Sequence, residues 1–271
     1  MAGQIRFSEI KVMQIGSFRK TLLSGKPVIG SWINSGSPII AELMANSGFD
    51  FLCVDVEHSA VDLPQTQTIF QAARSGNPKC HCLVRLHGVD YSFVKRYLDS
   101  GASGVIAPLV NTAAQAELLV EATKYPPLGN RGVGFCRGND YGASLKEYYR
   151  TANEDIMVAV QIEHHLGVSN IDAILEVEGV DAVFIGPYDL SASLGVAAQF
   201  DHPLYLEARN TVIEACKRHN IVAGIHVVHP EPEEILARVK EGYRLLAYSL
   251  DITMLMDACA RGLGAIKQEL G

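Results

Sequence analysis

Two acidic residues follow apolar stretches of the sequence and could together hold a metal ion. Glu163 ends "MVAVQIE", and Asp189 comes just after "AVFIG", within "GPYDLSASLG". Two carboxylates, with water in the remaining positions, suit a hard divalent cation such as Mg²⁺ or Mn²⁺. An Asp behind a strand also often caps a helix, so the metal hypothesis requires a fold that brings both carboxylates to one place.

A histidine and an arginine add the groups that proton transfer needs. His58 lies in "VDVEHS", where the carboxylate of Asp55 or Glu57 could fix one tautomer of its ring. Histidine is the side chain best suited to general-base work near neutral pH. Arg85 of "CLVRL" supplies a fixed positive charge that can stabilise an enolate or a carbonyl oxygen. A metal ion, a base and a fixed cation together indicate proton transfer beside a ketone, which is enolate chemistry.

The elements expected to position these residues alternate regularly along the chain. Short apolar stretches, each typical of a strand buried on both faces, are separated by segments with helical periodicity. The stretches are residues 28–33, 51–56, 82–86, 104–110, 157–163, 182–186, 222–227 and 245–250. We therefore predict a fold of the α/β class, a (β/α)8 TIM barrel that forms one domain over residues 1–271. The segment 7–25 is predicted to form an extra N-terminal helix that closes the bottom of the barrel.

In such a barrel the active site lies at the carboxyl ends of the strands. Under this prediction Asp55, Arg85, Glu163, Asp189 and His226 come from different strands and converge on one mouth. Each of these residues has an ordinary structural explanation by itself, as a cap, a turn residue or half of an ion pair. A buried charge costs free energy unless it is paired or metal-bound, so their convergence favours a functional site.

Composition excludes several other classes of protein. The net charge of −7 argues against a nucleic-acid partner, which is usually met by a basic face. No apolar run approaches the roughly 18 residues that span a bilayer, and no GxGxxG loop indicates a nucleotide. The six cysteines have no CxxC spacing, so we expect reduced, mostly buried thiols and a cytoplasmic protein. The lysines fall in predicted helices, in loops outside the mouth or before strands, which disfavours a Schiff-base mechanism.

Several motifs together resemble those of a known family. "GFDFLCVDVEHSAVD", "LVRL", "YPPLGNRGVG", "VQIE" and "GVDAVFIGPYDLSASLG" are similar to motifs of the HpcH/HpaI metal-dependent class II pyruvate aldolases. That group includes the 2-keto-3-deoxy sugar acid aldolases and the related macrophomate synthase. The resemblance covers about residues 28–267. It implies a lyase that cleaves a 4-hydroxy-2-oxo acid reversibly to pyruvate and an aldehyde through a metal-stabilised pyruvate enolate.

The resemblance also implies a role for individual residues. Glu163 and Asp189 match the metal ligands, for Mg²⁺, Mn²⁺ or Co²⁺. His58 matches a base that acts through a metal-bound water with Asp55 as its orienting partner, and Arg85 matches the residue that stabilises the enolate. The pyruvate pocket is expected to involve Gln161, Gly186, Pro187, Tyr188 and Leu250.

The same resemblance implies an assembly. Asp99 of "YLDSG" matches an acid that reaches the site of a neighbouring subunit. Members of the family are usually hexamers, built as trimers of dimers, in which the last helix is exchanged between partners.

Some residues depart from the family pattern, and two other functions stay open. His164, His165 and His226 stand where other residue types are usual, and Arg137 and Tyr141 of "GFCRGNDYG" could face the second substrate. These departures leave the acceptor aldehyde undetermined. The alternatives are an oxaloacetate decarboxylase or macrophomate-type lyase using the same enolate chemistry, and a non-catalytic barrel.

Overall fold

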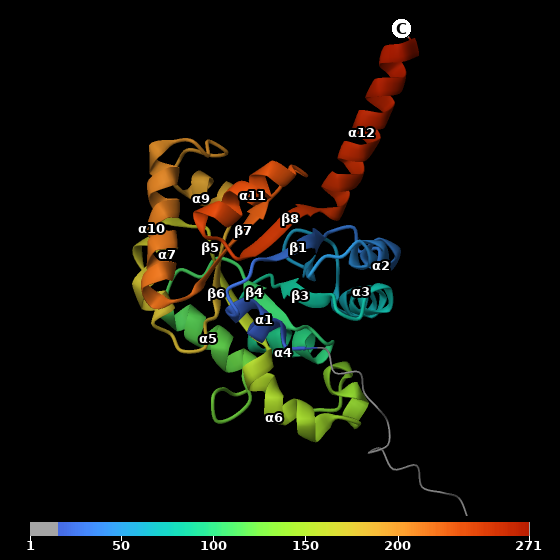
Figure 1. Ribbon diagram of the computed structural model, residues 1–271. Helices are drawn as coiled ribbons and strands as arrows, with labels where there is room; N and C mark the ends of the chain where they lie inside the picture. The colour runs from blue at the N-terminus through green and yellow to red at the C-terminus, as the bar shows by residue number, and fades with distance from the viewer. Residues whose placement is uncertain (1–15, 271) are drawn as a thin grey trace, which may run out of the picture.

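Parallel strands close into a complete barrel, as the alternation of apolar and amphipathic segments predicts. The computed structural model describes residues 16–270. Each strand pairs with the next along the chain, and the last pairs with the first (Figure 1). The strands are β1 (Val28–Ile33), β2 (Phe51–Asp55), β3 (His81–Arg85), β4 (Gly104–Ala107), β5 (Met157–Ile162), β6 (Ala182–Ile185), β7 (Val222–Val227) and β8 (Leu245–Leu250). The prediction of a (β/α)8 barrel with an N-terminal helix is confirmed.

Helices follow the strands and cover the outside of the barrel. Their ends carry the local signals expected from the sequence: the Ser37 side chain accepts a hydrogen bond at the start of α2, where Pro38 takes the first position. The helices are α1 (Phe18–Leu23), α2 (Pro38–Asn46), α3 (Leu63–Gly76), α4 (Tyr91–Asp99), α5 (Ala113–Thr123), η2 (Arg137–Gly142), α6 (Leu145–Asp155), α7 (His165–Ser169), α8 (Ile171–Leu175), α9 (Pro187–Ser193), α10 (Pro203–His219), α11 (Pro232–Glu241) and α12 (Asp251–Leu270).

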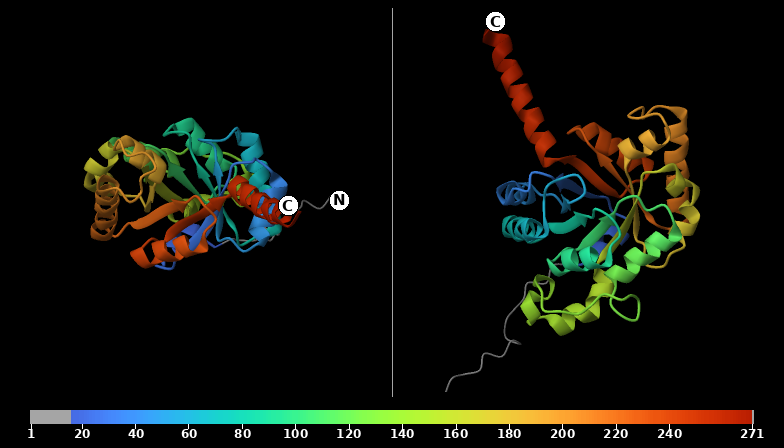
Figure 2. Two further views of the ribbon diagram at one scale, coloured as in Figure 1. Left: turned by 90° about the horizontal axis from the view of Figure 1, so that it is seen from above. Right: turned by 180° about the vertical axis from the view of Figure 1, so that it is seen from behind.

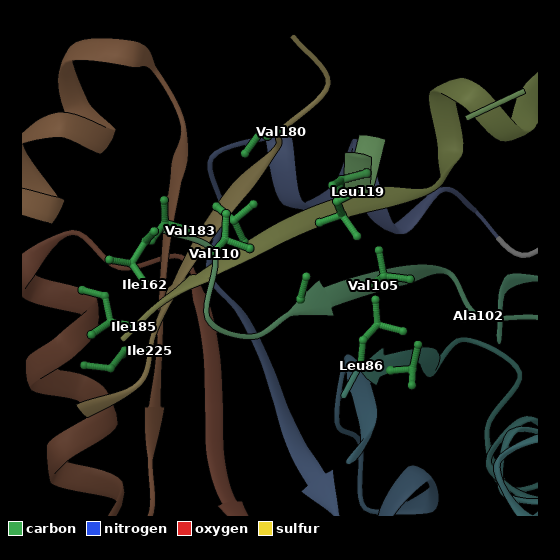
Figure 3. Packing of buried hydrophobic residues seen from close by; sticks show 14 of the residues in the cluster. Leu86, Ala102, Val105, Val110, Leu119, Ile162, Val180, Val183, Ile185 and Ile225 are labelled. Carbon is green, nitrogen blue, oxygen red and sulfur yellow. The ribbon is translucent and has the colours of Figure 1, made fainter. Parts of the chain in front are cut away.

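The core has two layers because successive side chains of a strand point to opposite faces. The outer layer lies between strands and helices, and Figure 3 shows Val183, Ile185 and Ile225 of neighbouring strands within it. The inner layer fills the barrel and includes Trp32, Phe51 and Phe184. Space inside is tight, since a Cβ at Gly30 would lie 2.4 Å from the Phe51 ring.

The bottom of the barrel is closed by α1. Its Phe18 and Leu22 are buried in the inner layer. The Phe18 ring lies 5.5 Å from that of Phe51 and 5.2 Å from that of His81, which begin β2 and β3. Residues 7–15 of the predicted N-terminal helix lie outside the described residues.

Two features lie at the periphery of the barrel. The connection from α5 to β5 carries η2 and α6, which the sequence did not predict as helices, at the side of the molecule away from α9 and α11 (Figure 1). Helix α12 leaves the end of β8 and extends away from the barrel (Figure 2). Beyond Asp251 no residue of α12 up to Leu270 is buried.

The described part of the chain agrees with two predictions from composition. Among residues 16–270 no helix is long and apolar enough to cross a membrane. All cysteines are unpaired thiols; Cys259 is exposed, Cys136 is half-buried and the others are buried.

Candidate active site

A pocket of about 190 Å³ opens at the carboxyl ends of the strands. It receives side chains from β1, β3, β5, β6, β7 and the loops and helix that follow; Arg85, Asp189 and His226 of the predicted set line it, whereas Asp55 and Glu163 do not. The lining residues are Trp32, His58, Arg85, Gln161, Phe184, Ile185, Gly186, Pro187, Tyr188, Asp189, His226 and Val228.

Glu163 lies directly behind the pocket wall and has no cationic partner among the described residues. Its side chain is buried, Oε1 accepts a hydrogen bond from the Leu109 amide at 2.7 Å, and Oε2 accepts one from the Gln161 side chain. Leu109 takes a positive φ of 51°, a conformation that costs free energy in a residue with a side chain. A buried carboxylate without an ion pair is the environment in which a bound cation gains most.

Gly186 leaves the space through which Glu163 can reach a ligand in the pocket. A Cβ at this position would lie 2.5 Å from Glu163 Oε2 and 3.0 Å from Gln161 Nε2. Asp189 follows in the first turn of α9, exposed at the pocket wall. These oxygen donors fit a divalent cation.

Arg85 is fixed on one side of the pocket. Its Nε and Nη2 donate to Asp55 Oδ1 at 2.9 Å and Oδ2 at 2.5 Å, and its guanidinium carbon lies 4.5 Å from the Trp32 ring centre. Burial acts to raise the pKa of Asp55, but the hydrogen bonds and charge of Arg85, together with the hydrogen bonds from the His58 amide and Asn34, hold the pKa below its ordinary value. Nη1 is left without a protein partner among the described residues, so it is free to donate to a ligand.

The Asp55 carboxylate organises the loop that carries His58. Oδ1 accepts the backbone amides of Glu57 at 3.0 Å and His58 at 3.2 Å, and Oδ2 accepts from Asn34 Nδ2 at 2.8 Å. Asn34 is positioned in turn by buried Asp251, whose Oδ1 accepts a hydrogen bond from the backbone N–H of Asn34 at 2.9 Å. Asp55 thus contacts the main chain of His58, and no hydrogen bond joins it to the imidazole in the described structure.

Glu57 is the carboxylate nearest to the His58 ring. Its Oε2 lies 3.8 Å from His58 Nε2 and 3.4 Å from Arg85 Nε, while the His58 side chain is 61% exposed. Burial raises the pKa of Glu57 to about 7; Arg85 acts against this shift, while Asp55 and Asp189 add to it. The sequence presents Glu57 as an alternative partner of His58, and the structure places its carboxylate between the His58 ring and Arg85.

Comparison with known proteins identifies the family of the chain. A model of the HpcH/HpaI aldolase/citrate lyase family matches residues 28–258. The chain belongs to this family. A hydroxypyruvate/pyruvate aldolase of Roseobacter denitrificans is 37% identical over 247 residues, covering 90% of this chain and 94% of that protein. A 2-keto-3-deoxy-L-rhamnonate aldolase of Klebsiella pneumoniae is 36% identical over 257 residues, covering 93% of each.

Solved structures of the HpcH/HpaI family have the same fold. The crystal structure of an HpcH/HpaI aldolase/citrate lyase family protein from Burkholderia cenocepacia superposes with a TM-score of 0.86 at 31% identity. The match covers 92% of this chain and 98% of that chain.

Several residues singled out in the sequence lie outside the pocket. Leu250 ends β8 beside Trp32 but is not a lining residue. Asp99 ends α4, at the opposite end of the barrel, and accepts a hydrogen bond from buried Arg131 at 2.8 Å. Arg137 donates to the carbonyl oxygen of Ser100 in the same region. Any role of Asp99 or Arg137 in catalysis therefore needs a second subunit.

His164 and His165 also lie outside the pocket lining. Their rings are 4.1 Å apart, and His164 Nδ1 accepts the Leu166 amide at the start of α7. His164 therefore caps the amino end of α7, which is a structural reason for a histidine there. His165 is exposed, and no contact of its side chain other than that with the His164 ring accounts for a histidine at this position.

Trp32 and His226 contribute more to the pocket than the sequence indicated. Trp32 was part of a predicted strand with no assigned role, yet its ring supports both Arg85 and His226. The sequence feature that could have indicated this role is a bulky aromatic residue near the carboxyl end of the first strand. His226 was noted as a departure, and the structure places it in the pocket lining.

Gly186→Ala is expected to weaken divalent metal binding by about 10- to 100-fold, because the new Cβ collides with Glu163 Oε2 and must displace it. Isothermal titration with Mn²⁺ measures this effect. Gly16→Ala is the matched control, since a Cβ there meets nothing within 4 Å and φ is ordinary. Equal affinities of Gly186→Ala and the parent protein would show that Glu163 is not a ligand.

Metal affinity is also expected to fall in acid. Burial raises the pKa of Glu163 to about 7; the Leu109 amide opposes the shift, and the charges of Glu57 and Asp189 add to it. A metal needs the ionised carboxylate, so below that pH binding must displace a proton. We expect the apparent affinity to fall by up to about tenfold per pH unit below pH 7 and to level off above it. Mn²⁺ titrations from about pH 5.5 to 8 test this, and a flat profile below pH 7 contradicts it.

Proposed function

We propose that the protein is a metal-dependent class II aldolase that cleaves a 4-hydroxy-2-oxo acid reversibly to pyruvate and an aldehyde. The observation that carries the proposal is one pocket lined by Asp189, Arg85 and His58, with buried Glu163 behind it at Gly186. The aldolase names of relatives that match nearly the whole chain support it.

Glu163 and Asp189 are the residues that would hold the cation. A bound divalent ion supplies positive charge to the carboxylate and ketone oxygens of a 2-oxo acid and so stabilises enolate charge. Mg²⁺, Mn²⁺ and Co²⁺ all suit carboxylate donors. The proposal includes no nucleotide and no Schiff-base lysine.

Arg85 stabilises the charge that develops on the substrate. Its side chain is locked by Asp55 and Trp32, so little reorganisation is needed when negative charge appears on the ketone oxygen. Nη1, which carries no protein hydrogen bond among the described residues, is the donor directed to that oxygen in this proposal. The backbone amides of Tyr188 and Asp189, in the first turn of α9, have no hydrogen-bond partner among the described residues and can donate to the substrate carboxylate, with Gln161 and Pro187 completing the pocket wall.

His58 removes the proton from the C4 hydroxyl in the cleavage direction and returns it in condensation. The ring lies at the open side of the pocket, where the aldehyde half of the substrate enters and leaves. Asp55 positions the His58 main chain, and Glu57 is the carboxylate that can stabilise the protonated imidazole. This division of roles is proposed from the distances above.

The experiment that tests the proposed function is a pyruvate-release assay over a panel of 4-hydroxy-2-oxo acids plus oxaloacetate, with and without chelator. Metal-dependent release of pyruvate from at least one hydroxy-oxo acid is expected. If oxaloacetate alone releases pyruvate, the decarboxylase alternative replaces the aldolase. Release from none of the substrates contradicts both functions.

We further propose that the chain assembles as a homo-oligomer, a hexamer built from dimers, and acts in the cytoplasm on a small molecule. Helix α12 carries an apolar stripe at helical spacing that the rest of the described chain does not cover. The stripe contains Ile252, Met256, Leu263, Ile266 and Leu270, which are 44%, 72%, 53%, 57% and 81% exposed. A partner subunit that covers it could also bring Asp99 to a neighbouring site.

The double variant Leu263→Glu, Ile266→Glu is expected to break this assembly, because each change places a charge on the apolar stripe. Light scattering coupled to size exclusion measures the mass against multiples of the 29.4 kDa chain. Gln268→Glu is the control that adds charge beside the stripe. An unchanged mass of the double variant would show that α12 is not an interface.

A further inference from the structure

A buried carboxylate that the proposed mechanism does not use stands at the start of α12. Asp251 is 3% exposed. Its oxygens accept hydrogen bonds from the backbone N–H groups of Asn34, Ser35 and Ile252 at 2.9, 3.0 and 2.9 Å, and from the Ser35 hydroxyl. Burying a carboxylate among neutral donors costs free energy that an apolar residue would not cost. Here the buried charge fixes the loop after β1 in one conformation.

An extra residue in β8 directs Asp251 toward that loop. Tyr248 and Ser249 of β8 together lie opposite the single residue Ser31 of β1, which makes a β-bulge. Ser249 has a positive φ of 52°, a conformation that costs free energy in a residue with a side chain. A bulge changes the direction of the side chains that follow it. Asp251, two residues later, reaches across to the loop after β1.

The strained conformation of Ser249 is held by neighbouring strands. Its carbonyl oxygen accepts from the Ser31 hydroxyl at 3.2 Å and from His226 Nε2 at 3.1 Å. Its own hydroxyl donates to the carbonyl oxygen of Val228 at 2.8 Å. Strained backbone persists where its surroundings hold it, and it is concentrated at functional sites. His226, which departs from the family pattern, therefore helps to hold the bulge that directs Asp251.

Asn34 transmits the position of the loop to the Asp55 carboxylate. Its Nδ2 donates to Asp55 Oδ2 at 2.8 Å, and the same oxygen accepts from Arg85 Nη2. Without the Asn34 side chain, Arg85 would be the one donor left to Oδ2 among the described residues, and the ion pair could shift. Oδ1 would keep the backbone amides of Glu57 and His58, so the loop that carries His58 would stay in place.

We infer that Asn34 and Asp251 are positioning residues that hold the Asp55 carboxylate. Asp55 in turn directs the Arg85 guanidinium at the enolate oxygen. Neither Asn34 nor Asp251 lines the pocket, so both act through other residues. The inference rests on the proposed function, because it takes from it the role of Arg85. Loss of the Asn34 side chain should therefore impair every reaction that needs Arg85, including one that needs no base.

The test measures oxaloacetate decarboxylation and aldol cleavage at pH 8 and saturating metal. Asn34→Ala should lower kcat for both by about 10- to 100-fold and change KM by less than about threefold, because the misplaced charge acts mainly on the transition state. Asn34→Asp keeps the shape, removes the donor and adds negative charge beside Asp55, so it should be impaired at least as much. Asn170→Ala, at an exposed asparagine between α7 and α8, is the control and should leave both rates unchanged.

A double-mutant cycle tests whether Asp251 acts through Asn34. Asp251→Asn keeps the shape and one accepting oxygen, so it should lower both rates by about 3- to 10-fold. The double variant Asn34→Ala, Asp251→Asn should match Asn34→Ala alone within about twofold. Losses that multiply would show that the two residues act independently, which overturns the assignment of Asp251.

Calorimetric titration of the Mn²⁺-loaded protein with oxalate, a dianion shaped like the pyruvate enolate, separates this inference from the proposed function. Asn34→Ala should weaken oxalate binding by about tenfold or more. If it does so while the parent protein releases pyruvate from no substrate, the inference holds and the aldolase function fails. If the parent is active but both rates and the oxalate affinity of Asn34→Ala stay within about twofold of it, the inference is wrong and the function holds.

Two further results would overturn the inference. A loss confined to aldol cleavage would show that Asn34 acts through His58 and not through Arg85. A milder defect in Asn34→Asp than in Asn34→Ala would show that the Asn34 side chain only fills space.

Discussion

Removal of divalent metal is expected to lower aldol cleavage by at least about 10³-fold, and added Mg²⁺, Mn²⁺ or Co²⁺ should restore it. A loss of that size corresponds to about 4 kcal/mol of transition-state stabilisation, which is reasonable for a cation placed at developing enolate charge. Among the described residues that line the pocket, Arg85 is the one arginine or lysine that remains once the metal is gone. Pyruvate release before and after chelation, followed by titration with each metal, measures the effect.

Glu163→Gln is the matched variant for this prediction. It keeps the shape of the side chain and its hydrogen bond from the Leu109 amide, but removes the charge that a cation needs. It should need far more metal for the same rate. Full activity after thorough chelation would contradict the assignment of Glu163 and Asp189, and a borohydride-trapped pyruvate adduct would indicate a lysine instead.

His58→Ala is expected to lower cleavage of a 4-hydroxy-2-oxo acid by about 10²- to 10⁴-fold, the range found when a positioned general base is lost. Metal binding should survive, because the His58 ring lies at the open side of the pocket while Glu163 is buried behind Gly186. His165→Ala changes another exposed histidine, the first residue of α7 at the same end of the barrel, and should have little effect. The measurements are kcat/KM for cleavage and the Mn²⁺ dissociation constant of each variant.

Activity of His58→Ala within about twofold of the parent protein would place the base elsewhere. His226 has too low a pKa, about 3, to serve near neutral pH. Glu57, with its pKa raised to about 7 by burial, would then be the first candidate.

The sequence was sufficient to predict the barrel and the end of it at which the candidate pocket lies. Periodicity identified every strand to within a few residues, because strands buried on both faces are apolar throughout and differ sharply from the amphipathic helices between them. The topology then brings strand ends together. Arg85, Gln161, Gly186 and Asp189 were therefore placed correctly at one mouth without knowledge of any distance.

What the sequence could not predict depends on tertiary packing. The Leu109 amide reaches Glu163 only because the backbone takes a left-handed conformation, and leucine gives no sign of this. Asp251 follows β8 and accepts a hydrogen bond from Asn34 in the loop after β1, where the last strand pairs with the first. The two residues are more than 200 positions apart in the sequence. The roles of Asp55 and Glu57 toward His58 were indistinguishable from spacing alone.

Helices η2 and α6 were missed for a related reason. The segment 137–155 is polar overall, and only Asn139 and Ala152 within these helices are buried. A helix that buries so few residues contains few apolar positions from which to predict it.

The central claim, that the pocket stabilises an enolate while His58 moves a proton, is tested most directly by comparing two substrates in one variant. Oxaloacetate loses CO₂ to give the enolate without abstraction of a proton, whereas aldol cleavage requires a base at the C4 hydroxyl. At one pH and saturating metal, His58→Ala should retain oxaloacetate decarboxylation while losing about 10²- to 10⁴-fold in aldol cleavage, and Arg85→Ala should reduce both. Equal suppression of both reactions by His58→Ala would show that His58 positions the metal or the enolate and does not transfer the proton.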